Sequence, residues 1–94
     1  MADVLEKFRR EISEVDYQIL ILVKQRLQLA EEIGTIKRRH GLPIVNPNVE
    51  KGVIERTLTW SRELGLDPDF TTKLANLLIA EAVRIQEKYL HLFP

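Results

Sequence analysis

Two cations sit among the apolar residues of the N-terminal third of the chain. Arg26 and Lys37 are eleven residues apart, which on an α-helix returns them to within about 20° of each other. Ala30 and Ile33 lie between them, so both cations belong to an apolar stripe. A charge in such a stripe is costly unless an anion meets it. The pair predicts either a bound anionic ligand, ion pairs with glutamates of another helix, or side chains that reach out to solvent.

Polar residues of the C-terminal half have similar surroundings. Gln86 follows Ala82 by four residues and precedes Tyr89 by three, which places it on an apolar helical face. A core glutamine hydrogen-bonded to a neighbouring segment is the ordinary interpretation. Glu81 falls near the same face, where it could neutralise a buried cation. Glu50 is expected in the first turn of a helix, where the helix dipole favours a carboxylate.

Several classes of chemistry have no residues to support them. The chain contains no cysteine, and His40 and His91 lack a nearby ligand pattern, so we expect no metal site. No serine occupies a nucleophile motif, and no glycine-rich phosphate loop is present. Fourteen basic residues balance fourteen acidic ones, which argues against a nucleic-acid partner. If the chain is an enzyme, its chemistry should need neither a nucleophile nor a metal.

The apolar pattern of the first part of the chain predicts one long helix from about Val4 to Arg39. Its apolar residues are spaced by threes and fours without an intervening proline, and Gly34 costs only about 1 kcal/mol. Basic residues in the last turn complement the helix dipole. Gly41 is expected to end the helix.

Two further helices have clear start signals. Asn46-Pro47 predicts an N-cap and first residue for a helix that ends at Leu64, before Gly65. Asp67-Pro68 repeats this signal for a third helix. Its apolar face is expected to contain Phe70, Leu74, Leu77, Leu78, Ile85, Tyr89 and Phe93. The pattern predicts an all-α fold with three helices in one domain, residues 1–94.

The length of the first helix bears on assembly. About 36 residues make a rod of roughly 54 Å, whereas a compact chain of this size has a diameter of about 32 Å. The apolar stripe nevertheless follows nearly the whole rod. We therefore expect an intertwined homodimer; the alternative is a kinked first helix in a monomeric bundle. No apolar run approaches the roughly 20 residues that span a bilayer and no signal peptide is evident, so a cytoplasmic protein without membrane contact is expected.

These residues, in this order, resemble the all-helical (AroQ-type) chorismate mutases over about 80 residues. The resemblance begins with the segment Phe8-Arg9-Arg10-Glu11-Ile12-Ser13-Glu14-Val15-Asp16. It continues through Arg26, Ile33-Gly34-Thr35-Ile36-Lys37, Pro43, Glu50 and Gln86. It implies an isomerase that converts chorismate to prephenate in the biosynthesis of phenylalanine and tyrosine, without metal or cofactor.

The resemblance also implies roles for individual residues. Arg9 would reach the partner's active site and bind substrate carboxylates together with Arg26. Lys37 and Gln86 would hydrogen-bond the ether oxygen of the breaking C–O bond, and Glu50 would accept a hydrogen bond from the ring hydroxyl. Arg9 lies about 25 Å up the helix from Arg26, so an antiparallel partner is better placed than the same chain to bring the two together.

Three positions depart from the family pattern. Family members often have an arginine at the position of Val49, an acidic residue at Asn46 and, in some cases, a serine at Ala82. These three residues are still expected to lie against the substrate. The ring carboxylate would then be bound by fewer donors, or by one of Arg38, Arg39 and Lys51.

Two other functions remain open. An isochorismate-pyruvate lyase shares the implied fold and cationic site, although Glu50 favours the mutase. A non-catalytic helical dimerisation module would leave Arg9, Arg26, Lys37 and Gln86 as unrelated residues.

Overall fold

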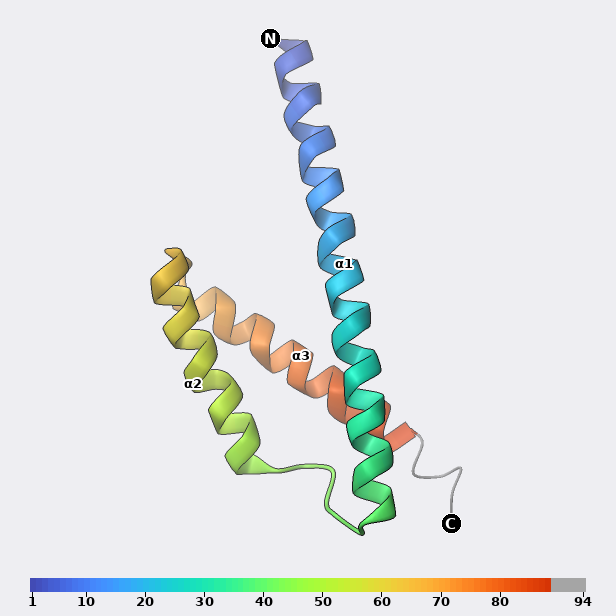
Figure 1. Cartoon of the computed structure of the whole chain (residues 1–94). Helices are drawn as coiled ribbons and strands as arrows, with labels where there is room; N and C mark the ends of the chain where they lie inside the picture. The colour runs from blue at the N-terminus through green and yellow to red at the C-terminus, as the bar shows by residue number, and fades with distance from the viewer. Residues whose placement is uncertain (89–94) are drawn as a thin grey trace.

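The computed structural model describes residues 1–88, which form three α-helices (Figure 1). They are α1 (Ala2–Arg39), α2 (Pro47–Leu64) and α3 (Pro68–Lys88). Residues 1–88 contain no strand, so the expected all-helical fold is confirmed. Tyr89 and Phe93, which the sequence analysis assigned to the third helix, lie outside the described residues.

The helix ends follow the local signals of the sequence. The backbone N–H of Val49 donates to the Asn46 side-chain oxygen at 3.3 Å, which caps α2. Gly65 ends α2 in the left-handed conformation, with φ of 69°, a conformation that glycine adopts without steric cost. The predicted bounds of α2 are confirmed, and α1 begins two residues earlier than expected.

The N-terminal part of α1 extends away from the other two helices as a free arm (Figure 1). All 38 residues of α1 form one uninterrupted helix, so the alternative of a kinked first helix is wrong. The apolar stripe along this arm is uncovered in the single chain. Its members are 50–62% exposed: Val4, Phe8, Ile12, Val15, Ile19 and Leu22.

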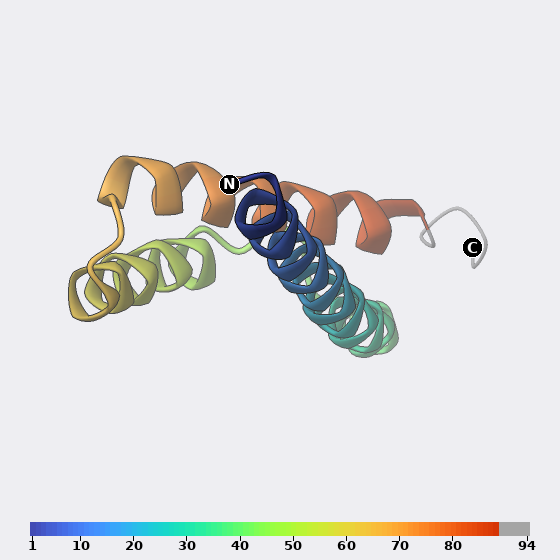
Figure 2. The same cartoon turned by 90° about the horizontal axis from the view of Figure 1, so that it is seen from above.

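Helix α3 packs against both α1 and α2, and Figure 2 shows α1 crossing α3 while α2 lies to one side. The α3 residues buried by this packing are Thr71, Ala75 and Gln86. The hydroxyl groups of Thr71 and Ser61 bond to each other between α3 and α2. On the apolar face expected for the third helix, Phe70, Leu74 and Leu77 remain 43–69% exposed in the single chain.

The single chain is extended. Its radius of gyration is 17.2 Å and its extents are 60 × 28 × 14 Å, whereas a compact chain of this length has a radius of gyration of about 12 Å. Ala30 and Ala75 are the only apolar side chains among residues 1–88 that are buried. Within the same residues, no helix is long and apolar enough to cross a membrane.

Candidate active site

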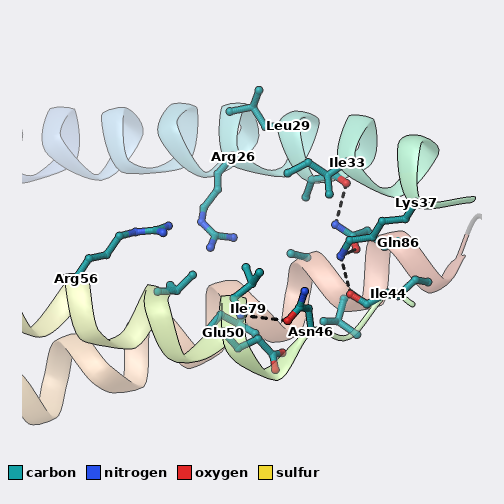
Figure 3. Close-up of a pocket in the computed structure, with 15 residues that line it drawn as sticks. Arg26, Leu29, Ile33, Lys37, Ile44, Asn46, Glu50, Arg56, Ile79 and Gln86 are labelled. Carbon is teal, nitrogen blue, oxygen red and sulfur yellow. Dashed lines mark hydrogen bonds between the residues drawn. The ribbon is translucent and has the colours of Figure 1, made fainter. Parts of the chain in front are cut away.

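A cavity of about 380 Å³ lies between the C-terminal half of α1, the first half of α2 and the C-terminal half of α3 (Figure 3). This volume is in the range of small-molecule sites. Its lining consists of apolar side chains with a few polar groups between them. The lining residues are Arg26, Leu29, Ala30, Ile33, Lys37, Ile44, Asn46, Val49, Glu50, Val53, Arg56, Ile79, Ala82, Val83 and Gln86.

Lys37 and Gln86 meet at one end of this cavity. Nζ of Lys37 donates to Oε1 of Gln86 at 3.2 Å and to the backbone oxygen of Ile44 at 2.6 Å. Nε2 of Gln86 donates to the backbone oxygen of Ala30 at 3.0 Å. Since an ammonium group has three protons and an amide NH₂ has two, each side chain keeps one proton without an acceptor among residues 1–88. Both are available to a ligand oxygen.

Gly34 allows Gln86 to approach α1 so closely. A Cβ atom at position 34 would lie 2.9 Å from Cγ of Gln86 and 3.4 Å from its Cβ. The side chain of Gln86, which is 5% exposed, therefore fills the space that a larger residue would occupy. Glycine at position 34 lowers the stability of the helix, but it allows the Gln86 amide to lie against α1.

Arg26 enters the cavity from the middle of α1. Its Nη1 donates to the backbone oxygen of Leu78 at 3.1 Å, and no carboxylate within residues 1–88 pairs with it. Burial lowers the pKa of Arg26, and the nearby charge of Arg56 lowers it further. The interpretation that glutamates neutralise Arg26 and Lys37 is wrong for the described chain. Glu81 instead pairs with Arg84 on its own helix.

The first turn of α2 supplies the opposite wall. Asn46 lines the cavity as well as capping the helix, and Val49 and Ala82 contribute only apolar surface. Glu50 is half-buried and is the one carboxylate among the described lining residues. The cations of the described lining are Arg26, Lys37 and Arg56.

Arg9 is the one expected site residue that the single chain does not bring to the cavity. It lies on the free arm of α1, where Nη1 contacts Oε1 of Glu6 at 2.7 Å and its side chain is 68% exposed. All the other expected site residues line the cavity. They are Arg26, Lys37, Asn46, Val49, Glu50, Ala82 and Gln86.

Arg56 lines the cavity but was missed by the sequence analysis, which named Arg38, Arg39 and Lys51 as substitute cations. None of those three lines it. One signal could have found Arg56. It follows Val49 by seven residues, or nearly two helical turns, so the two residues share a face of α2 within about 20°.

Residues 8–87 match the family described as chorismate mutase type II. The chorismate mutase of Methanocaldococcus jannaschii is 32% identical over 90 residues, which cover 96% of this chain and 91% of that protein. The 4-amino-4-deoxychorismate mutase of Streptomyces venezuelae is 30% identical over 83 residues, covering 88% and 81%. The bifunctional chorismate mutase/prephenate dehydratase of Escherichia coli is 32% identical over 82 residues, covering 87% of this chain but 21% of that protein.

Proposed function

The chain belongs to the chorismate mutase type II family, and on that premise we propose that it converts chorismate to prephenate in the cavity between α1, α2 and α3. The observation that carries this proposal is the pair Lys37 and Gln86, whose remaining N–H protons are available at the same end of a cationic cavity. The reaction is an isomerisation. It belongs to the biosynthesis of phenylalanine and tyrosine.

The arrangement suits the electronic demands of this rearrangement. Chorismate is a dianion in which one C–O bond breaks while a C–C bond forms, with no proton transferred and no covalent intermediate. The protein must hold the enolpyruvyl arm over the ring and stabilise negative charge that grows on the ether oxygen. Hydrogen bonds from a charged donor contribute about 1.5–3 kcal/mol each. Those from Lys37 and Gln86 to the ether oxygen lower the barrier to the extent that they strengthen in the transition state.

The other cavity residues have binding roles in this proposal. Arg26, which has no carboxylate partner within residues 1–88, binds a substrate carboxylate. Glu50 accepts a hydrogen bond from the ring hydroxyl. Asn46, Val49 and Ala82 lie against the substrate and contribute shape.

The proposal includes a homodimer in which Arg9 of each copy completes the site of its partner. Support comes from the uncovered stripe on α1, because exposed apolar residues of this size and number are normally covered in a soluble protein. An antiparallel partner along α1 would cover the stripe. It would also carry Arg9, which is about 25 Å from Arg26 along the same helix, to the other end of the pair.

Turnover of chorismate tests the proposed reaction. The purified chain should remove the chorismate absorbance with prephenate as the product, identified by NMR. Stable chorismate would contradict the proposal and favour a dimerisation module. Release of salicylate and pyruvate from isochorismate, with no action on chorismate, would favour the lyase. The cytoplasmic location expected from the sequence stays a prediction.

A second candidate substrate is 4-amino-4-deoxychorismate, which is named for the relative from Streptomyces venezuelae. Its amino group is a cation at neutral pH and would pair with Glu50, the one carboxylate of the described lining. The neutral Val49 also leaves this wall less positive than the arginine of many family members. The ratio of kcat/KM for the two substrates decides between them.

A further inference from the structure

Two guanidinium groups face the same part of the cavity without a carboxylate between them. Figure 3 shows the side chains of Arg26 and Arg56 extending into the space between α1 and α2. Neither arginine forms an ion pair with any residue in the range 1–88. The charge of Arg56 contributes to the lowered pKa of Arg26, because the two cations repel each other. An anion between them would relieve this repulsion.

The direction of the Arg56 side chain follows from its place on α2. Helical side chains lean toward the N-terminus of their helix, so Arg56 reaches back over the turn that contains Val53 and toward Val49. Four residues later, the ring of Trp60 lies 5.9 Å from the Arg56 guanidinium carbon, within the range of a cation–π contact.

The nearest carboxylate along the helix does not draw Arg56 away from the cavity. Glu55 contacts Lys51, with 4.0 Å between Nζ and Oε1. Arg56 forms no ion pair within residues 1–88, and its guanidinium presents five N–H donors in a planar fork that matches a carboxylate. Its side chain is exposed, so packing does not explain its direction.

We propose that Arg56 is a further substrate-binding residue, which binds one carboxylate of the substrate dianion together with Arg26. Arg56 lies nearly two helical turns after Val49 on α2. It supplies the positive charge that an arginine at position 49 would otherwise provide. This inference rests on the proposed function, because the ligand is the same dianion. It differs from the roles assigned above in placing one carboxylate between α1 and α2 of the same chain.

Substitution of Arg56 tests the inference. In Arg56→Gln, KM for chorismate should rise by about tenfold to a hundredfold, the range expected for loss of a charge-assisted pair, while kcat changes much less. Arg56→Lys should recover part of this loss, because it keeps the charge but not the fork. Arg62→Gln is the matched control, an exposed arginine of α2 outside the cavity, and should leave KM unchanged. Far-UV circular dichroism checks that each variant is folded.

Fluorescence gives an independent readout, because Trp60 is the single tryptophan of the chain. Titration with prephenate should change Trp60 emission in the wild type as Arg56 shifts from the ring to the carboxylate. The same titration should give no such change in Arg56→Gln at concentrations that saturate it. An active wild type with unchanged KM and an unchanged fluorescence response in Arg56→Gln overturns this inference alone. An inactive wild type that does not bind prephenate overturns the proposed function and this inference together.

Discussion

Lys37 and Gln86 come from α1 and α3 and are held in place by backbone oxygens of the loop after α1 and of α1 itself. The Ile44 carbonyl fixes the ammonium group and the Ala30 carbonyl fixes the amide. Because these contacts are made within the chain itself, the donors need little rearrangement during the reaction. Preorganisation of this kind is a major source of catalytic stabilisation.

Removal of the Lys37 ammonium should therefore reduce the rate of the chemical step. Lys37→Ala is expected to lower kcat by about a hundredfold or more, as for loss of one preorganised donor. Lys24→Ala is the control, because Lys24 is an exposed lysine of α1 outside the cavity. Steady-state kinetics measures kcat for both variants. A normal kcat in Lys37→Ala would show that Lys37 has no part in the mechanism.

Gly34 and Gly52 give opposite predictions for the same substitution. Gly34→Ala places a Cβ 2.9 Å from Cγ of Gln86, so Gln86 must move and kcat should fall. In Gly34→Ala, helix propensity adds about 1 kcal/mol of stability, whereas overpacking costs about 1–3 kcal/mol. We expect a net loss of stability. Gly52→Ala meets no atom within 4 Å in the chain and should stabilise by up to about 1 kcal/mol. Urea unfolding and kcat measure both effects; equal stability changes would contradict this account of Gly34.

At the residue scale, the sequence predicted buried polar groups better than exposed ones. Lys37 and Gln86 stood out because polar residues in apolar stripes are unusual. Arg56 gave no such signal, because an exposed arginine of an amphipathic helix is normally solvated. The cavity that Arg56 lines exists only because α1 lies opposite α2, which the sequence of α2 alone does not reveal.

At the scale of the helices, ends were predicted more reliably than faces. Asn46-Pro47 and Gly65 determine the ends of α2 through local backbone chemistry. The inward face of α3 depends instead on which neighbour covers it. Thr71 and Ala75 pack within the chain, whereas the larger Leu74 remains 43% exposed, because small residues allow close helix approach and the large ones are left for another surface.

The uncovered stripe of α1 leads to a prediction about assembly. The wild type should sediment at about twice the chain mass of 11.0 kDa. Ile19→Glu, which places a charge in the stripe, should shift the protein toward monomer or unfolded chain and abolish activity, because burial of an unpaired charge is costly. Lys24→Glu changes a residue of α1 outside the stripe and should remain dimeric. A folded 11.0 kDa wild type at micromolar concentration, measured by sedimentation equilibrium, would contradict the dimer.

At the scale of the whole molecule, the extended shape and the incomplete site have one explanation. The chain leaves most of its large apolar residues exposed and leaves Arg9 outside the cavity. A second copy that packs along α1 would cover the former and supply the latter. Dimer assembly and substrate binding would then depend on the same helix.

Mixing two inactive variants tests this claim most directly. Arg9→Ala and Arg26→Ala should each be nearly inactive, since each lacks one carboxylate-binding arginine in every site. After subunit exchange, a mixed dimer would have one site without either arginine and one site with both. Random pairing of equal amounts should restore about a quarter of wild-type activity per chain, because half the dimers are mixed and each has one intact site. No recovery, with exchange verified by mass tagging, would contradict a site shared between two copies.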